Sequence, residues 1–362
     1  MLPEAFSLIS SNTIYSNSIE IRLNGVESQA ALYVPVAPPP VRLPCPDKME
    51  NESMPSPMQF VVIGAGNIGC VYGGNLARIG QKVGFVDVWQ EHTDAIRQQG
   101  LRLEGLTGDF IVPADATTDP SEAPKADAVI VCVNAYSTPD AARTARQVLK
   151  DGGYCVTLQN GIGNIEILSE ALGAGRVLAG LSFQSGDLAA PGFIRHTTSG
   201  PTYIGELDRS RTERLEQLNS LLAQAGLNPV LVDDVVATIW TKFVHNCGIN
   251  AICAITGLRP GHIQEVPDLG DFQTGVIEET LALIRAKGVR IEDPDPVATV
   301  KQYCLDKFHR VSMVQHLDRG RLTEIDALNG YVARESPKYG LSAPYNESLA
   351  KLMKGREHKP RA

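Results

Sequence analysis

Hydrophobic and polar positions follow two different patterns along the chain. Between residues 59 and 234, short runs of consecutive apolar residues alternate with stretches in which apolar positions recur every three to four residues. The first pattern is typical of strands buried on both faces, and the second of amphipathic helices. The predicted strands are 59–64, 82–88, 126–134, 153–160, 176–183 and 229–234. The predicted helices between them are 67–80, 138–151, 165–173 and 209–226.

This alternation predicts a parallel sheet covered by helices on both faces, which is a Rossmann-like doubly wound α/β fold. Two segments add to it: residues 101–113 predict a hairpin or a pair of short strands, and residues 193–208 an antiparallel addition. After about residue 233 the strand pattern ends, and we expect an all-helical C-terminal domain. Its predicted helical segments are 235–257, 273–288, 296–308, 323–340 and 346–355.

The first part of the chain has neither pattern. Residues 37–57 are rich in Pro, Ser and Glu, and residues 1–18 lack the basic and solidly apolar regions of a signal peptide. We therefore expect a disordered N-terminal extension and a fold that starts at Met58; a wrongly assigned upstream start codon would explain the extension. The predicted parts are the extension 1–57, an α/β domain 58–232 and a helical domain 233–356.

Composition and charge exclude several classes of function. The chain has 362 residues with 43% hydrophobic and 20% charged content, which is ordinary for a globular protein of two domains. A net charge of -8 argues against nucleic acid or an anionic membrane as the main partner, and no apolar run is long enough to span a bilayer. The seven cysteines include no CxxC pair. We expect free thiols in a cytoplasmic protein, with no metal site.

A glycine-rich segment joins the first predicted strand to the first predicted helix. Its residues are Gly64, Ala65, Gly66, Asn67, Ile68 and Gly69. The first glycine permits a tight turn, the second lets the backbone approach a pyrophosphate, and the third lets helix and strand pack closely. Asp87 follows 18 residues after Gly69, at the end of the next strand, where a ribose-binding carboxylate is expected. The context predicts a dinucleotide site; the alternative is a glycine-rich turn in a cofactor-free fold.

Asp87 also bears on which dinucleotide is bound. A carboxylate at this position accepts hydrogen bonds from the ribose hydroxyls of NAD and repels the 2′-phosphate of NADP. Residues 87–92 contain no arginine, which is the residue an NADP site usually offers. The sequence therefore favours NAD(H). The alternative is that Asp87 points elsewhere and that Arg97 or Lys82 holds NADP.

A polar stripe interrupts the predicted helix over residues 235–257. Lys242, Asn246 and Asn250 are spaced by four residues, which stacks them on one helix face. Hydride transfer to a keto carbon creates an alkoxide that needs a proton donor, and burial lowers the pKa of a lysine toward that task. The two amides would orient substrate oxygens without adding charge. The alternative is a lysine whose stem follows apolar surface and whose ammonium lies in water.

Four separated segments together resemble the ketopantoate reductase (2-dehydropantoate 2-reductase) family. The segments are 64–69, 158–164, 240–250 and 312–330, and the resemblance covers about residues 58–355. It implies a Rossmann domain and a helical domain with the active site in the cleft between them. It also implies NAD(P)H-dependent reduction of 2-dehydropantoate to (R)-pantoate, a step of pantothenate and coenzyme A biosynthesis, with NADP as the cofactor usual in the family.

The resemblance assigns a role to each matching residue. Lys242 matches the general acid, Asn160 an asparagine that meets both cofactor and substrate, and Glu324 a glutamate on the cofactor side. The residues that match substrate-binding positions are Asn246, Asn250 and Ser312. Taken without the family, Asn160 equally fits a turn, Ser312 a helix cap and Glu324 a solvated helix carboxylate.

Asp87 departs from the family pattern, which favours NADP, and three further positions depart from it as well. Asn134 stands where a lysine near the cofactor is usual, and we still assign it to the cofactor site. His316 replaces an aspartate, and Pro260 lies where an asparagine is usual. These departures leave two other functions open: a related NAD-dependent 2-hydroxy-acid or opine-type dehydrogenase, and a dinucleotide sensor without catalysis. In each enzymatic case the expected partner is a small 2-oxo acid, and we expect a monomer or a homodimer.

Overall fold

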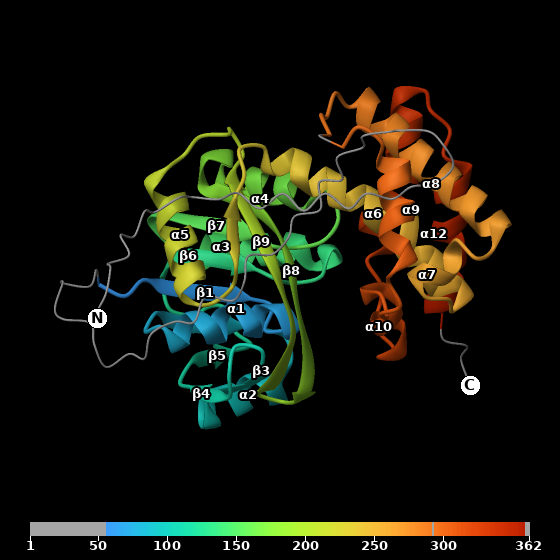
Figure 1. Ribbon diagram of the computed structural model, residues 1–362. Helices are drawn as coiled ribbons and strands as arrows, with labels where there is room; N and C mark the ends of the chain where they lie inside the picture. Colours follow the sequence, from blue (N-terminus) through green and yellow to red (C-terminus); the bar gives the residue numbers. More distant parts are fainter. Residues whose placement is uncertain (1–55, 292, 359–362) are drawn as a thin grey trace, which may run out of the picture. The chain divides into compact units, whose positions relative to one another are not determined.

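The computed structural model describes residues 56–291 and 293–358, and within them all strands precede the long helix α6 (Figure 1). The predicted disordered extension falls almost entirely on residues 1–55, which lie outside the described residues. The strands are β1 (Gln59–Ile63), β2 (Lys82–Val86), β3 (Leu101–Gly105), β4 (Phe110–Val112), β5 (Asp115–Thr117), β6 (Ala126–Val131), β7 (Leu149–Thr157), β8 (Val177–Ala190), β9 (Phe193–Glu206) and β10 (Pro229–Leu231). The helices among them are α1 (Asn67–Arg78), α2 (Gln90–Gln99), η1 (Ala135–Ser137), α3 (Thr138–Val148), α4 (Asn164–Leu172), η2 (Ala174–Arg176) and α5 (Glu213–Gln224).

The strands form a single mixed sheet in the order β4-β3-β9-β8-β7-β6-β1-β2-β5, with β10 paired to β9. The run from β8 to β5 is parallel throughout. The predicted antiparallel addition is confirmed, because β9 pairs antiparallel with β8, and so is the predicted hairpin of β3 and β4. The strand β5 has only three residues, too few for its pattern to predict it from the sequence.

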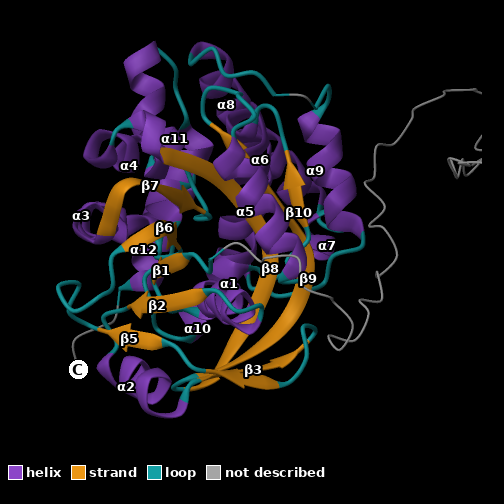
Figure 2. Cartoon of the chain, turned by 90° about the vertical axis from the view of Figure 1, so that its left-hand side faces the viewer, coloured by secondary structure: helices purple, strands orange, loops and turns teal. Residues whose placement is uncertain are grey.

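Helices cover both faces of this sheet. Alternate side chains of a strand point to opposite faces, so β1 contributes to two cores. Phe60 and Val62 lie in a core shared with α1 and α5, whereas Val61 and Ile63 lie in a core shared with α3 and α4. Figure 2 shows α3 and α4 on one side of the central strands and α1 on the other. The predicted doubly wound fold is therefore confirmed.

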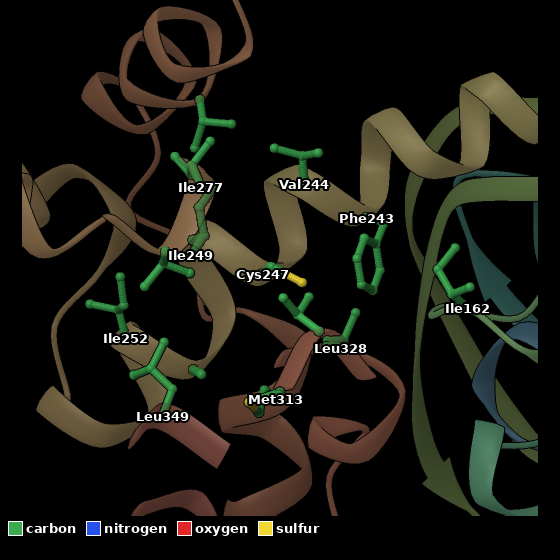
Figure 3. Close-up of a cluster of buried hydrophobic side chains, with 14 of the residues drawn as sticks. Ile162, Phe243, Val244, Cys247, Ile249, Ile252, Ile277, Met313, Leu328 and Leu349 are labelled. Carbon is green, nitrogen blue, oxygen red and sulfur yellow. The ribbon is translucent and has the colours of Figure 1, made fainter. Parts of the chain in front are cut away.

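The second half of the described chain is helical, as predicted, and α6 (Val235–Thr256) runs through its core. Asp234 caps the start of α6 by accepting a hydrogen bond from the Ala237 N–H (2.9 Å), and Gly257 ends it with φ of 78°. Apolar residues of α6 such as Phe243 and Cys247 form the centre of this core (Figure 3). The other helices are α7 (Pro260–Ile263), α8 (Pro267–Ala286), α9 (Pro296–Leu305), α10 (Ser312–Asp318), η3 (Ile325–Ala327), α11 (Asn329–Glu335), η4 (Ser336–Tyr339) and α12 (Pro344–Glu357).

The segment 323–340 differs from its predicted continuous helical pattern. It forms three short helices, because Leu328 has a non-helical backbone (φ −115°, ψ −111°) between η3 and α11. Asn329, which follows, donates its amide to the Cys247 carbonyl of α6 (3.0 Å) and so anchors the break. None of the helices in the two described ranges is long and apolar enough to cross a membrane. The domain boundaries at residues 57 and 232 stay a prediction.

Candidate active site

The candidate site lies at the carboxyl edge of the parallel strands. β1, β6 and β7 are neighbours in the sheet, so the loops that follow them lie side by side. One contact shows how close they are: the Gln159 side chain, after β7, donates to the Val133 carbonyl after β6 (2.9 Å). In doubly wound sheets, ligands bind at this edge.

The glycine-rich loop after β1 fits a dinucleotide pyrophosphate. α1 begins after Gly66, and neither a side-chain cap nor an acidic residue occupies its first turn. Its first N–H groups are therefore free of side-chain acceptors and point toward the loop, as an anion site requires. Gly69 is needed for packing, because a Cβ there would lie 1.9 Å from the Gly64 carbonyl oxygen.

Asp87 lies beside this loop. One carboxylate oxygen accepts a hydrogen bond from the Ala65 N–H (2.7 Å), and the other accepts one from the Trp89 N–H (3.0 Å). The carboxylate thus ties the end of β2 to the glycine-rich turn. Each oxygen has a second lone pair, so both retain an acceptor site for a ribose hydroxyl.

Lys242 projects from α6 toward β8. Its ammonium donates a hydrogen bond to the Ser182 carbonyl (2.8 Å) and lies 4.6 Å from the centre of the Phe183 ring. Burial lowers the pKa of Lys242 to about 8, and the nearby negative charge of Glu324 opposes part of that effect. A lysine with this pKa gives up its proton far more readily than one in water, so Lys242 is suited to act as a general acid.

Asn160 and Glu324 face the same region from different halves of the chain. The Asn160 amide donates to the Glu324 carboxylate (3.3 Å), although the two residues are 164 positions apart. Glu324 is only 8% exposed and precedes η3, so it is not the solvated helix carboxylate that its sequence alone allowed. Burial raises the pKa of Glu324, while the Asn160 amide, the Ala135 N–H and the Lys242 ammonium act against that rise.

A small pocket brings the loop after β7 and the stripe of α6 together. Its empty space is about 220 Å³, which includes the open solvent at its mouth. Polar groups of Lys242, Asn246 and Asn160 share its wall with apolar side chains. The full set of lining residues is Gln159, Asn160, Gly161, Leu181, Ile239, Lys242, Phe243 and Asn246. A carboxylate with a neighbouring carbonyl suits a pocket that offers an ammonium and two amides.

The structure adds a buried amide and hydroxyl network that sequence reasoning missed. The Gln159 amide donates to the Thr138 hydroxyl (2.8 Å), which donates to the Asn164 side chain (2.7 Å). Asn164 in turn donates to the Asn160 carbonyl (3.0 Å). The network fixes the loop that presents Asn160. Gln159 and Asn164 lie close to Asn160 in the segment after a predicted strand, so the sequence could have pointed to them. No sequence pattern marked Thr138 as a member of this network.

Some predicted residues are not at the pocket wall. Asn250 is 7% exposed on α6, farther along the helix than the pocket. Ser312 is exposed at the first position of α10 and does not cap it, since Val311 is the cap residue. Asn134 donates its amide to the Tyr136 hydroxyl (2.8 Å) after β6. His316 is half-buried, and burial lowers its pKa.

Comparison with known proteins agrees with this geometry. The family model for ketopantoate reductase PanE/ApbA matches residues 60–209, and the model for the C-terminal part of the same family matches residues 234–357. The chain belongs to the ketopantoate reductase family. A 2-dehydropantoate 2-reductase from Pyrococcus horikoshii is 31% identical over 300 residues, which are 83% of this chain and 98% of that protein.

Solved structures of relatives share the whole described fold. A PanE/ApbA family ketopantoate reductase from Ralstonia eutropha is 33% identical, with a TM-score of 0.77 over 83% of this chain and 98% of the other. D-mandelate dehydrogenase, solved with NADH and anilino(oxo)acetate, is 24% identical with a TM-score of 0.76 over 83% and 98% of the two chains, and so shares the fold. As a member of the ketopantoate reductase family, the chain is an oxidoreductase with a nicotinamide dinucleotide cofactor and a small keto acid as substrate.

Proposed function

We propose that the chain is a 2-dehydropantoate 2-reductase, which reduces the keto group of 2-dehydropantoate to give (R)-pantoate. The observation that carries the proposal is the placement of Lys242. Its ammonium, with a pKa lowered to about 8, shares the wall of a small pocket with the amides of Asn160 and Asn246. A proton donor and two neutral hydrogen-bonding groups are what a 2-oxo acid needs on one side of its keto group.

The bound nicotinamide dinucleotide supplies the hydride. Lys242 donates its Nζ proton to the keto oxygen as negative charge develops there. Asn160 and Asn246 hold the substrate's oxygens, and Asn250 and Ser312 are proposed to complete the substrate site farther along the helical half. Glu324 holds the Asn160 amide and keeps a negative charge near the ammonium, which limits the fall of the lysine pKa.

We further propose that the cofactor is NAD(H) rather than the NADP(H) usual in the family. The support is Asp87, whose carboxylate lies against the Ala65 N–H at the mouth of the glycine-rich loop. Neither cation that could serve NADP is well placed. Lys82 begins β2 at the end opposite to Asp87, and Arg97 already pairs with Asp94 (2.6 Å). The glycine-rich residues 64–69 bind the pyrophosphate in this proposal, and Asn134 lies on the nicotinamide side.

One observation favours a different 2-oxo acid as the substrate. Pro260 is buried at the start of α7, where the family usually has an asparagine. A proline has no side-chain hydrogen-bond donor, so this position gives no preference for a 2-oxo acid that carries the hydroxyl of 2-dehydropantoate. The candidate is a related 2-hydroxy-acid dehydrogenase that keeps Lys242 as its acid.

A panel of 2-oxo acids, assayed with NADH and with NADPH, tests these proposals together. We expect the highest kcat/KM with 2-dehydropantoate and NADH. A higher value with another 2-oxo acid would favour the second candidate. If the protein binds NADH but turns over none of the acids with either dinucleotide, the result would favour a dinucleotide sensor without catalysis. The cytoplasm is the proposed compartment, since the cysteines of the described part are unpaired thiols.

A further inference from the structure

The contacts of Lys242 on β8 come from two adjacent residues. Ser182 offers its carbonyl at 2.8 Å, and Phe183 offers the face of its ring at 4.6 Å. The first contact is with the backbone of β8 and the second with a side chain, so the position of Lys242 depends on the path of the strand and on the direction of one ring. The pairing of β8 with β9 shifts register between Ser182 and Gln184. Phe183 alone lies between these two pairs on β8, whereas Gly200 and Pro201 lie between their partners on β9, so β9 has a bulge opposite Phe183.

The sequence of β9 explains the bulge. Gly200 and Pro201 lie opposite Phe183, and a proline has no N–H to donate to a partner strand. A Cβ at Gly200 would lie 2.7 Å from both the Cβ and the carbonyl oxygen of Phe183, so only glycine allows this close approach. The result aims the Phe183 ring, which is 41% exposed, toward the ammonium of Lys242.

The ladder around Ser182 leaves its carbonyl available to Lys242. β7 pairs with β8 only as far as Thr157 and Ala179, so β8 continues past the end of its neighbour. On the other side, the N–H of Thr202, which is paired with Ser182, donates to the Asn228 carbonyl (2.8 Å).

A buried tyrosine from the cofactor-binding helix holds this irregular stretch. Tyr72 of α1 is 0% exposed, and its hydroxyl lies 2.9 Å from the Ser182 hydroxyl and 2.5 Å from the Thr202 hydroxyl. Thr202 also donates to the Leu227 carbonyl (2.8 Å), and the Ser182 hydroxyl accepts from the Gln184 N–H (3.1 Å). These bonds join α1, both strands at the bulge and the loop before β10.

We propose that Tyr72 is a positioning residue, which fixes β8 and β9 beside the bulge and thereby holds the ammonium of Lys242 against the Ser182 carbonyl and the Phe183 ring. The inference rests on the proposed role of Lys242 as the proton donor. Tyr72 touches neither the pocket wall nor Lys242 itself, and it belongs to the helix whose first turn faces the dinucleotide. It therefore connects the cofactor half of the site to the acid.

Loss of the Tyr72 hydroxyl should change the chemistry more than the binding. A loosened bulge weakens the contacts that stabilise the charged lysine, so the pKa of Lys242 falls. The rate of keto-acid reduction then begins to drop at a lower pH, because the lysine must be protonated to act. Among the charged groups of the described elements around Lys242, Glu324 acts on its pKa, and Tyr72→Phe leaves that carboxylate and its Asn160 contact in place.

The experiment compares Tyr72→Phe with Tyr154→Phe in the full chain. Tyr154 is a matched control: it is 3% exposed on β7, and its hydroxyl has no hydrogen-bond partner among the described residues. For Tyr72→Phe we expect kcat to fall about 3- to 10-fold and the basic limb of the pH profile to move down by about 0.5 to 1 pH unit, the effect of one weakened hydrogen bond. KM for dinucleotide and keto acid should stay within about twofold, and Tyr154→Phe should match wild type.

Each outcome decides between the inference and its alternative. A folded Tyr72→Phe variant with wild-type kcat and an unmoved basic limb would overturn the positioning role. If Tyr72→Phe fails to fold, Ser182→Ala decides, because it removes the hydroxyl that Tyr72 contacts and keeps the carbonyl that Lys242 contacts. The same downward shift supports the inference, and an unchanged limb overturns it. Lys242→Ala is assayed alongside. If it retains turnover, the proposed function itself fails; if it loses turnover while the two bulge variants behave as wild type, only this inference fails.

Discussion

The two halves of the site contribute different parts of the chain. At the end of β1, the proposed cofactor side consists mainly of backbone: an uncapped helix start and glycines whose missing side chains leave room. On α6, the proposed substrate side consists of side chains, with Lys242 and Asn246 stacked one turn apart on a buried helix. A backbone site is sensitive to added atoms, whereas a side-chain site is sensitive to removed ones. The comparison therefore predicts opposite kinds of damage from substitutions on the two sides.

Removing the Lys242 side chain should have the largest effect on catalysis. Lys242→Ala deletes the proton donor while α6 keeps its core contacts, so kcat should fall about 10²- to 10⁴-fold. Steady-state rates with 2-dehydropantoate and NADH measure the change. The exposed Lys351→Ala on α12 is the control and should leave kcat as in wild type. Near-normal turnover in Lys242→Ala would show that another group supplies the proton.

Adding one methyl group to the cofactor side should mainly weaken dinucleotide binding. In Gly69→Ala the new Cβ would lie 1.9 Å from the Gly64 carbonyl oxygen, so the turn must move. Overpacking of this kind disturbs the local structure by about 1–3 kcal/mol, which corresponds to a roughly 5- to 150-fold higher Kd for NADH. Gly355→Ala on α12 meets nothing within 4 Å and is the matched control. Equal Kd values for NADH in Gly69→Ala and wild type would show that the close turn at Gly69 does not contribute to dinucleotide binding.

Changing Asp87 should alter the choice of dinucleotide by a smaller factor. Asp87→Ala removes the carboxylate that accepts from a ribose and repels a 2′-phosphate, so the ratio of kcat/KM for NADH to that for NADPH should fall about 5- to 30-fold. The ratio is its own control, because a general loss of the loop geometry lowers both values together. An unchanged ratio would mean that Asp87 acts only on the Ala65 and Trp89 N–H groups.

The smallest expected effect is a gain in stability that accompanies the loss of function. Because burial lowers the pKa of Lys242 from its ordinary value of 10.5 to about 8, the folded protein holds this charge unfavourably below pH 8. Lys242→Met should therefore raise the free energy of unfolding at pH 7 by about 1–2 kcal/mol. Lys242 keeps its proton up to a higher pH in the unfolded chain than in the folded one, so the wild type gains stability between pH 8 and 10.5. The difference in the free energy of unfolding between Lys242→Met and wild type should therefore shrink in that range. Urea unfolding at pH 7 and pH 10 measures it; a less stable variant at pH 7 would contradict the cause of the shift.

The sequence predicted the geometry of the glycine-rich loop more completely than the surroundings of Lys242. Glycines 64–69 and Asp87 are close in sequence, and local pattern was sufficient to predict the turn between β1 and α1. The stripe on α6 also followed from helix geometry. Local pattern could not supply the surroundings of Lys242. The bulge opposite Phe183 lies in another strand, at Gly200 and Pro201, and Tyr72 contacts the neighbouring Ser182 from α1. The three short helices in 323–340 escaped prediction for a similar reason, because Asn329 is held by a carbonyl of α6.

The pH dependence of kcat/KM for keto-acid reduction, in wild type and in Lys242→Ala, tests the role of the lysine most directly. The wild-type value should be level at neutral pH and fall about tenfold per unit above pH about 8, where the lysine loses its proton. The low residual rate of Lys242→Ala should lack this fall. A wild-type rate that stays level to pH 10, or a variant that keeps the same fall, would contradict Lys242 as the proton donor.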